Sequence, residues 1–210
     1  MIKTFTVTLL VLFVVACHGA DPVIYKPAQY QMVMKTYVKG SKVFIGRVAI
    51  DHVVGKFSHK LTSPQGFQSQ YIYIQSIDTL YMLEQDPSSK AWSCIKRANT
   101  GIDNIAGDPL RVDLFNGMTF QGKMNCKNQD SQMSGICYRY DKKIVASMTI
   151  DYSLYTNATS AQNLPIQFYR TVSSQDPILV TTYDDYVLGP VSPNEFNLPV
   201  PESKCTTQLE

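Results

Sequence analysis

The fold is decided by residues 31–61, which read QMVMKTYVKGSKVFIGRVAIDHVVGKFSHKL. Apolar and polar side chains alternate along residues 31–38, and residues 39–42 supply a turn before a second strand at 43–51. A third alternating segment follows Gly55. Three short consecutive strands of this kind predict an antiparallel meander. The side chains expected on its apolar face include Met32, Met34, Val38, Phe57, His59 and Leu61.

The same pattern continues through the rest of the chain. Further strands are expected at 71–77, 79–83, 91–97, 143–152, 165–172 and 177–188. The clearest alternation lies in 143–152, where Ile144, Ala146, Met148, Ile150 and Tyr152 face one way. After residue 188 four prolines exclude a regular helix or central strand, which predicts an extended strap held by Cys205. Single-sided alternation favours a mostly β fold, an antiparallel sandwich or half-barrel, whose sheets pack together or enclose a cavity.

The first 20 residues have the organisation of a cleavable secretory signal. Lys3 precedes an apolar run from Phe5 to Ala16, and small residues follow as far as Ala20. The run is shorter than the roughly 20 residues that span a bilayer, and no later segment replaces it as a membrane anchor. Residues 21–210 are then expected to form one domain of a secreted, extracellular protein. The alternative is a bacterial lipoprotein in which Cys17 is lipidated.

The composition argues against a nucleic-acid surface and against a recognisable catalytic centre. One of the 19 basic residues lies in the signal, which leaves 18 against 17 acidic residues, without clusters. The sequence contains no G-x-S-x-G or H-E-x-x-H motif and no Gly-rich phosphate loop. Asp184 and Asp185 could serve as a carboxylate pair for glycoside chemistry, but a solvated strand end explains them more simply. We therefore expect a protein that is not an enzyme and needs no cofactor.

Four of the five cysteines follow the signal, an even number on an oxidising route. Cys126 and Cys137 are close enough in sequence to link one hairpin, which would leave Cys94 to hold Cys205. The two other pairings of four cysteines remain open. A zinc site is not expected, because the sequence has no C-x-x-C and only two of its three histidines lie outside the signal.

Two polar positions are candidates for modification or binding. Asn157 begins the sequence Asn-Ala-Thr, an N-glycosylation acceptor in a polar stretch between strands. His59 lies on the apolar side of its strand, where it could meet a ligand head group or titrate on acidification. The alternative for His59 is an ordinary buried histidine. The many Tyr residues in predicted strands fit a pocket lining or ordinary cross-strand pairs equally well.

Residues 183–199, YDDYVLGPVSPNEFNLP, followed by Cys205, resemble the ending of the ependymin-related secreted glycoproteins, especially their development-specific LVN-like branch. In that family an aromatic and acidic stretch, a Gly, a Pro, a Phe and a Pro-rich approach to a final cysteine recur. Residues 46–51, and residues 78–83 before Cys94, resemble earlier strands of the same branch. The chain has fewer cysteines than the vertebrate members, so their full disulfide scheme cannot be transferred.

The resemblance implies two stacked, curved antiparallel sheets around a hydrophobic pocket, as in bacterial lipoprotein carriers. It also implies a secreted or lysosomal protein that binds a lipid or fatty acid. The alternative is adhesion to extracellular matrix, or self-association, through the outer surface. Calcium association is attributed to the family, but the sequence has no Asp-rich calcium loop and we expect no metal. The side chains that we expect to line the pocket are Met32, Met34, Phe57, His59, Leu61, Ile144, Met148, Ile150 and Phe168.

Overall fold

The computed structural model describes residues 21–25, 27–38, 43–98, 117–126, 135–145, 149–159, 162–172 and 179–208. The strands are β1 (Gln29–Val38), β2 (Phe44–Asp51), β3 (Lys56–Thr62), β4 (Gln68–Ile74), β5 (Thr79–Gln85), β6 (Trp92–Ala98), β7 (Thr119–Asn125), β8 (Ile136–Val145), β9 (Thr149–Asn157), β10 (Pro165–Val172), β11 (Leu179–Leu188) and β12 (Thr206–Thr207). Short 3₁₀ turns are η1 (Gln75–Ile77), η3 (Pro193–Phe196) and η4 (Glu202–Lys204). The described chain is therefore mostly β.

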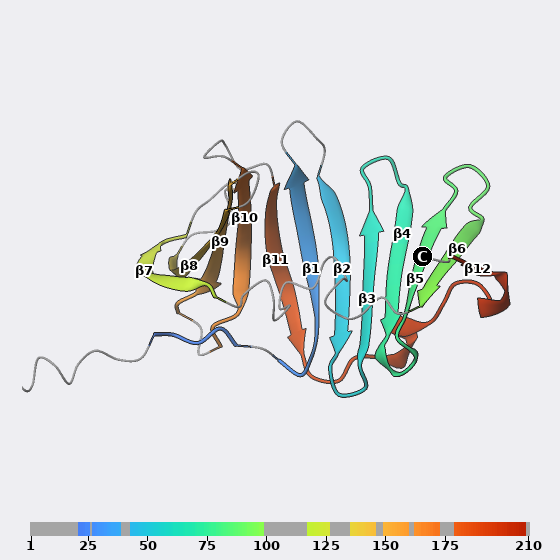
Figure 1. Cartoon of the computed structure of the whole chain (residues 1–210), viewed down its shortest axis with the longest axis horizontal. Coiled ribbons are helices and arrows are strands. Elements are labelled where there is room, and N and C mark those ends of the chain that lie inside the picture. Colours follow the sequence, from blue (N-terminus) through green and yellow to red (C-terminus); the bar gives the residue numbers. More distant parts are fainter. Residues whose placement is uncertain are drawn as a thin grey trace, which may run out of the picture.

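All twelve strands belong to one curved, open sheet with the order β12-β6-β5-β4-β3-β2-β1-β11-β10-β9-β8-β7 (Figure 1). β1–β6 form one antiparallel meander, and β7–β11 form another. The two meanders join where β1 pairs with β11, from Tyr30 opposite Leu188 to Val38 opposite Leu179. The curved, mostly β fold expected from the sequence is confirmed, but the described strands form one continuous sheet instead of the two stacked sheets that the resemblance implied.

The sheet has two faces, which we name after one residue on each. On the Met32 face, Met32 lies beside Val48, His59 and Tyr71 across β1–β4. On the Ala49 face, Ala49 lies between partners on β1 and β3. Because side chains alternate along a strand, this register assigns the regular positions of the strands to one face or the other.

The segment that follows β11 packs on the Ala49 face. Val191 and Phe196 bury Ala49 against them. The carboxylate of Glu195, in η3, lies 3.0 Å from the Nζ of Lys60 on β3. The apolar contacts and the ion pair both fix this segment across the sheet, as the proline pattern predicts for a strap.

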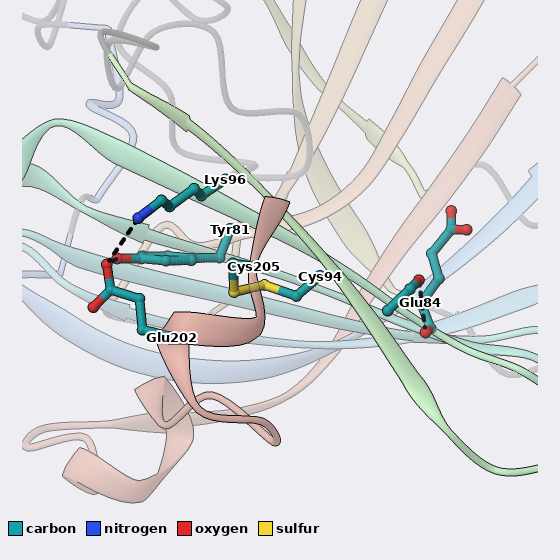
Figure 2. Close-up of a disulfide and its surroundings, with 7 residues drawn as sticks. Tyr81, Glu84, Cys94, Lys96, Glu202 and Cys205 are labelled. Carbon is teal, nitrogen blue, oxygen red and sulfur yellow. Dashed lines mark hydrogen bonds and ion pairs between the residues drawn. A yellow bond between two sulfur atoms is a disulfide. The ribbon is translucent and has the colours of Figure 1, made fainter. Parts of the chain in front are cut away.

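A disulfide between Cys94 and Cys205 holds the end of the strap on β6. Next to it, the hydroxyl of Tyr81 donates a 2.9 Å hydrogen bond to the carboxylate of Glu202 (Figure 2). The Nζ of Lys96 lies 3.6 Å from the same carboxylate. Burial, together with the hydrogen bond to Glu202, raises the pKa of Tyr81 to about 12. The Tyr81 hydroxyl therefore stays protonated at neutral pH and holds the strap as a donor.

The second disulfide joins Cys126 to Cys137, with their Cα atoms 5.0 Å apart, and links the end of β7 to β8. Both disulfides match the pairing favoured by the cysteine spacing. Two covalent links of this kind are compatible with a protein of an oxidising compartment.

Residues 143–152 are not one strand, and this prediction was wrong. β8 ends at Val145, β9 begins at Thr149, and Ile144 lies directly opposite Ile150 in an antiparallel pair. The period-two pattern continues unbroken from one arm of the hairpin to the other. No Gly, Asn or Pro marks the reversal in the sequence, so alternation alone could not reveal it.

The segment at residues 21–25 is fixed at one end of β8–β10. The hydroxyl of Tyr140 donates to the carbonyl of Pro22 at 2.7 Å, and the side-chain amide of Asn163 donates to the carbonyl of Val23 at 2.9 Å. In the part of the chain that the structure describes, no helix is both long and apolar enough to cross a bilayer. The expected signal, with Cys17, lies outside the described residues.

Candidate functional site

A single apolar cluster extends over the Met32 face through β1–β5 and β8–β11. Its side chains are at most 7% exposed, so they form the main core of the sheet. The members are Tyr30, Met32, Met34, Val48, Ile50, Phe57, Tyr73, Leu80, Tyr140, Leu154, Phe168 and Tyr183. Aromatic and Met side chains dominate this cluster, and both kinds adapt well to apolar partners of irregular shape.

Half-buried apolar side chains surround this cluster on the same sheet. Tyr71 and Met82 flank it on β4 and β5, and Tyr138 and Tyr152 flank it on β8 and β9. Tyr152 stacks on Phe168 with the ring centroids 5.7 Å apart. These flanking side chains keep part of their apolar surface accessible, whereas the centre of the cluster is fully buried.

His59 places an imidazole within this apolar face. The residue is 4% exposed, and its ring centroid lies 6.3 Å from the rings of both Phe57 and Tyr71. Its Nε2 has no hydrogen-bond partner in the described ranges. Desolvation lowers the pKa of His59 to about 4, so the ring is neutral at neutral pH. A neutral imidazole offers one donor and one acceptor, which suits a hydroxyl or carbonyl rather than a charged group.

Gly46 makes room for the His59 ring. A Cβ built on Gly46 would lie 2.7 Å from Nε2 of His59 and 3.2 Å from Cδ2 of Leu61. Real Cβ contacts are essentially never as short as the first of these. The close approach of ring and backbone therefore requires a glycine at this position on β2.

The structure brings most of the predicted pocket residues onto one face. Those that share the Met32 face close to its centre are Met32, Met34, Phe57, His59, Leu61 and Phe168. Ile144 and Ile150 lie at the far end of the β8–β9 hairpin, outside the buried cluster, and Ile144 is 40% exposed. Both nevertheless lie on the Met32 face, because the alternation of side chains is kept across the hairpin. Met148 lies outside the described residues.

Sequence reasoning missed four core members, Tyr30, Val48, Ile50 and Leu154, which are at most 2% exposed. The signal for Val48 and Ile50 was present, since both lie in step with Gly46 in the predicted strand 43–51. Leu154 was missed because the strand was expected to end at residue 152.

Several other predicted positions serve local structure. The carboxylate of Asp184 lies 3.4 Å from the Nζ of Lys35 on the Ala49 face. Asp185 is exposed and has a φ of 51°, where β11 and β1 lose regular register.

Asn157 ends β9, and its Oδ1 accepts a 2.9 Å hydrogen bond from the backbone N–H of Thr159. No group of three metal-binding side chains occurs among the residues that the structure describes.

A separate open pocket of about 380 Å³ lies where β5 and β6 are joined, lined in part by Phe67, Trp92 and Asp86. The Oδ1 of Asp86 accepts hydrogen bonds from the backbone N–H groups of Ser88 and Ser89, at 3.0 and 2.6 Å. These bonds lower the pKa of Asp86. The carboxylate of Asp86 is thus used by the turn itself.

The sequence matches no protein-family model and no curated protein. An uncharacterized conserved protein from Thermus thermophilus has the same fold, with a TM-score of 0.57 and 6% identity over 87% of this chain and 91% of that chain. The MucA/MucB complex of Pseudomonas aeruginosa gives a TM-score of 0.47 and 9% identity over 85% of this chain and 57% of the other. The LolA superfamily protein NE2245 from Nitrosomonas europaea gives a TM-score of 0.40 and 10% identity, over 85% of this chain and 94% of that chain. The first similarity establishes the fold alone.

Proposed function

We propose that the protein is a secreted, non-enzymatic binder of an apolar ligand, a lipid or fatty acid, held on the Met32 face. The observation that carries the proposal is the continuous apolar cluster over β1–β5 and β8–β11. Apart from Ile24 and Met118, the described residues outside the strands that join its apolar clusters pack on the opposite face. The resemblance of residues 183–199 to ependymin-related glycoproteins supports the same proposal.

The half-buried side chains around the cluster are the expected ligand contacts. Tyr71 and Met82 on one side, and Tyr138 and Tyr152 on the other, offer apolar surface that a ligand could remove from water. Burying about 300 Å² of such surface contributes about 7 kcal/mol before the loss of ligand freedom is subtracted. Affinities in the micromolar range would be a natural outcome for a carrier that must also release its ligand.

We propose that the chain is exported and glycosylated at Asn157. The two disulfides suit an oxidising compartment. Asn157 lies at the end of a strand, directly before a turn, where the side chain is half-buried rather than enclosed. Peptide mapping with and without removal of N-glycans tests the site directly.

Native mass spectrometry of the secreted protein, before and after denaturation, tests the binding proposal. We expect bound mass that disappears on denaturation and is recovered as lipid by organic extraction. In titrations with a fluorescent fatty acid, Met82→Asp should weaken uptake about tenfold or more, because it brings a charge to the apolar face. The matched control is Thr62→Asp, which adds the same charge at an exposed position on the Ala49 face.

An empty protein that takes up no fatty acid would exclude the proposal. Equal uptake by the Met82→Asp and Thr62→Asp variants would exclude the Met32 face as the binding surface. In the first case, binding of matrix components or self-association through the outer surface would be the function to test next.

A further inference from the structure

Arg170 lies at one end of the Met32 face. In β10 it follows Phe168 by two residues, and its cross-strand partners are Tyr152 on β9 and Leu179 on β11. The side chain is half-buried, and its Nε atom is inaccessible to water. That atom has no hydrogen-bond partner in the described ranges. In the part of the chain that the structure describes, this nitrogen of a cationic side chain therefore lies against the apolar cluster without a hydrogen-bond acceptor.

A second arginine on the other face shows the contrast. The Nε of Arg139 donates to Asp141 at 2.8 Å, and its Nη2 lies 2.7 Å from the same carboxylate. Asp151, which adjoins Tyr152 on β9, also points to the Ala49 face by strand alternation. The residues paired with Arg170 on β9 and β11 are both uncharged. Among the described residues, these two strand neighbours supply no anion to Arg170.

His59 cannot supply the charged end of the site. It is on β3, which is four strand spacings from β10 in the order of the sheet, or about 19 Å. Burial keeps its imidazole neutral at neutral pH. The guanidinium of Arg170 presents a planar fork of donors that matches a carboxylate or phosphate. Between His59 and Arg170, only the guanidinium can neutralise an acid, and Lys142, opposite Tyr152 on β8, adds a second cation to the same end of the face.

We infer that Arg170 holds the head group of the ligand, and that this ligand is an amphiphile with an anionic head. The guanidinium would bind two oxygens of a carboxylate or phosphate ester, while the chain lies over Phe168 and the flanking aromatic side chains. The inference rests on the proposed function and adds the chemical class of the ligand. It also assigns a direction, with the head at the β10 end and the chain toward β1.

The test compares three ligands of equal chain length: hexadecanoate, hexadecyl phosphate and hexadecanol. Each is titrated by displacement of a fluorescent fatty acid at mildly alkaline pH, where the acid is ionised. We expect the wild type to bind hexadecanoate, hexadecyl phosphate or both about tenfold tighter than hexadecanol, as a charge-assisted bond pair would give. The preferred anion identifies the head group. Arg170→Met should abolish the preference, and Arg170→Lys should retain part of it.

The matched control is Lys143→Gln, which removes a positive charge from the Ala49 face of β8 and should leave all three affinities unchanged. Equal affinities for acid, phosphate and alcohol in the wild type would overturn this inference alone and leave the proposed function intact. An unchanged preference in Arg170→Met would do the same. Failure of all three ligands to bind would overturn both. If Arg170→Met does not fold, the inference is still tested by the affinities of the wild type and of Arg170→Lys for the three ligands.

Discussion

Glu195 on the Ala49 face pairs with two cations, whereas two buried nitrogen atoms of the Met32 face have no hydrogen-bond partner among the described residues. On the Ala49 face, Glu195 lies 3.4 Å from Arg47 and 3.0 Å from Lys60. On the Met32 face, Nε2 of His59 and Nε of Arg170 lack hydrogen-bond partners among the described residues. Unsatisfied buried groups reduce stability and persist where they serve another purpose. We expect the strap side of the sheet to contribute most to stability, and the proposed ligand to bind on the other side.

The largest effect is expected from removing the covalent link of the strap. Cys94→Ala together with Cys205→Ala opens a loop with a sequence separation of 111 residues, which should lower the free energy of unfolding by about 5 kcal/mol. Replacing Cys126 and Cys137, which have a sequence separation of 11 residues, should lower the free energy of unfolding by about 3 kcal/mol. Urea denaturation of both double variants measures the difference. Equal losses would break the assignment of stability to the strap.

The buried imidazole should make the protein sensitive to acid. The pKa of His59 falls from 6.5 when unfolded to about 4 when folded, so the unfolded chain binds more protons between these values. Stability is therefore lost as pH falls through this window, by about 3 kcal/mol in total. His59→Phe should remove this contribution, while His52→Gln, at an exposed position, should retain it. The test is the urea midpoint of each protein, measured at several pH values between the two pKa values. If the midpoint depends on pH in the same way for the wild type and both variants, the prediction is contradicted.

A smaller loss is expected from filling the space beside the imidazole. Gly46→Ala forces a Cβ toward Nε2 of His59 and should destabilise the protein by about 2 kcal/mol. Combining it with His59→Ser removes the clashing ring, so the two changes should couple by at least about 1 kcal/mol. Thermal or urea unfolding of the four proteins closes this cycle. Strict additivity would show that the ring yields without strain.

The smallest effect concerns the ion pairs of the strap. Glu195→Gln removes the carboxylate shared by Arg47 and Lys60, whose side chains are 57% and 43% exposed. Water screens such pairs, so the loss should stay below about 1 kcal/mol and diminish in high salt. Comparing unfolding of the variant and the wild type at two salt concentrations measures it. A larger, salt-independent loss would mean that the carboxylate is effectively buried.

The meander β1–β6 could be predicted from sequence because each strand has one apolar face and ends near a turn. The strap could be predicted for a similar reason, since its prolines exclude the alternatives. β7 was missed, because Phe120 and Met124 are separated by Gly122, where the pairing with β8 loses register. The pairing of β1 with β11 could not be predicted either, since alternation within a strand holds no information about its neighbour.

The candidate site was predictable to a similar extent. His59 could be found because it interrupts an apolar alternation between Phe57 and Leu61. Arg170 could not, because a charged residue in a predicted strand is ordinarily assigned to solvent. Its importance lies in the uncharged residues that face it on the neighbouring described strands, which depends on which strands lie next to β10.

The pairing of β1 with β11 also constrains how this protein is made. Tyr30 and Leu188 are opposite each other, so the two meanders cannot join until nearly the whole domain has been synthesised. Contacts between such distant parts of a chain form slowly, since a long loop must close first. Until then each meander exposes unpaired strand edges, which are prone to aggregation. A nascent chain of this topology therefore keeps the edges of β1 and of the second meander unpaired until its last long strand emerges.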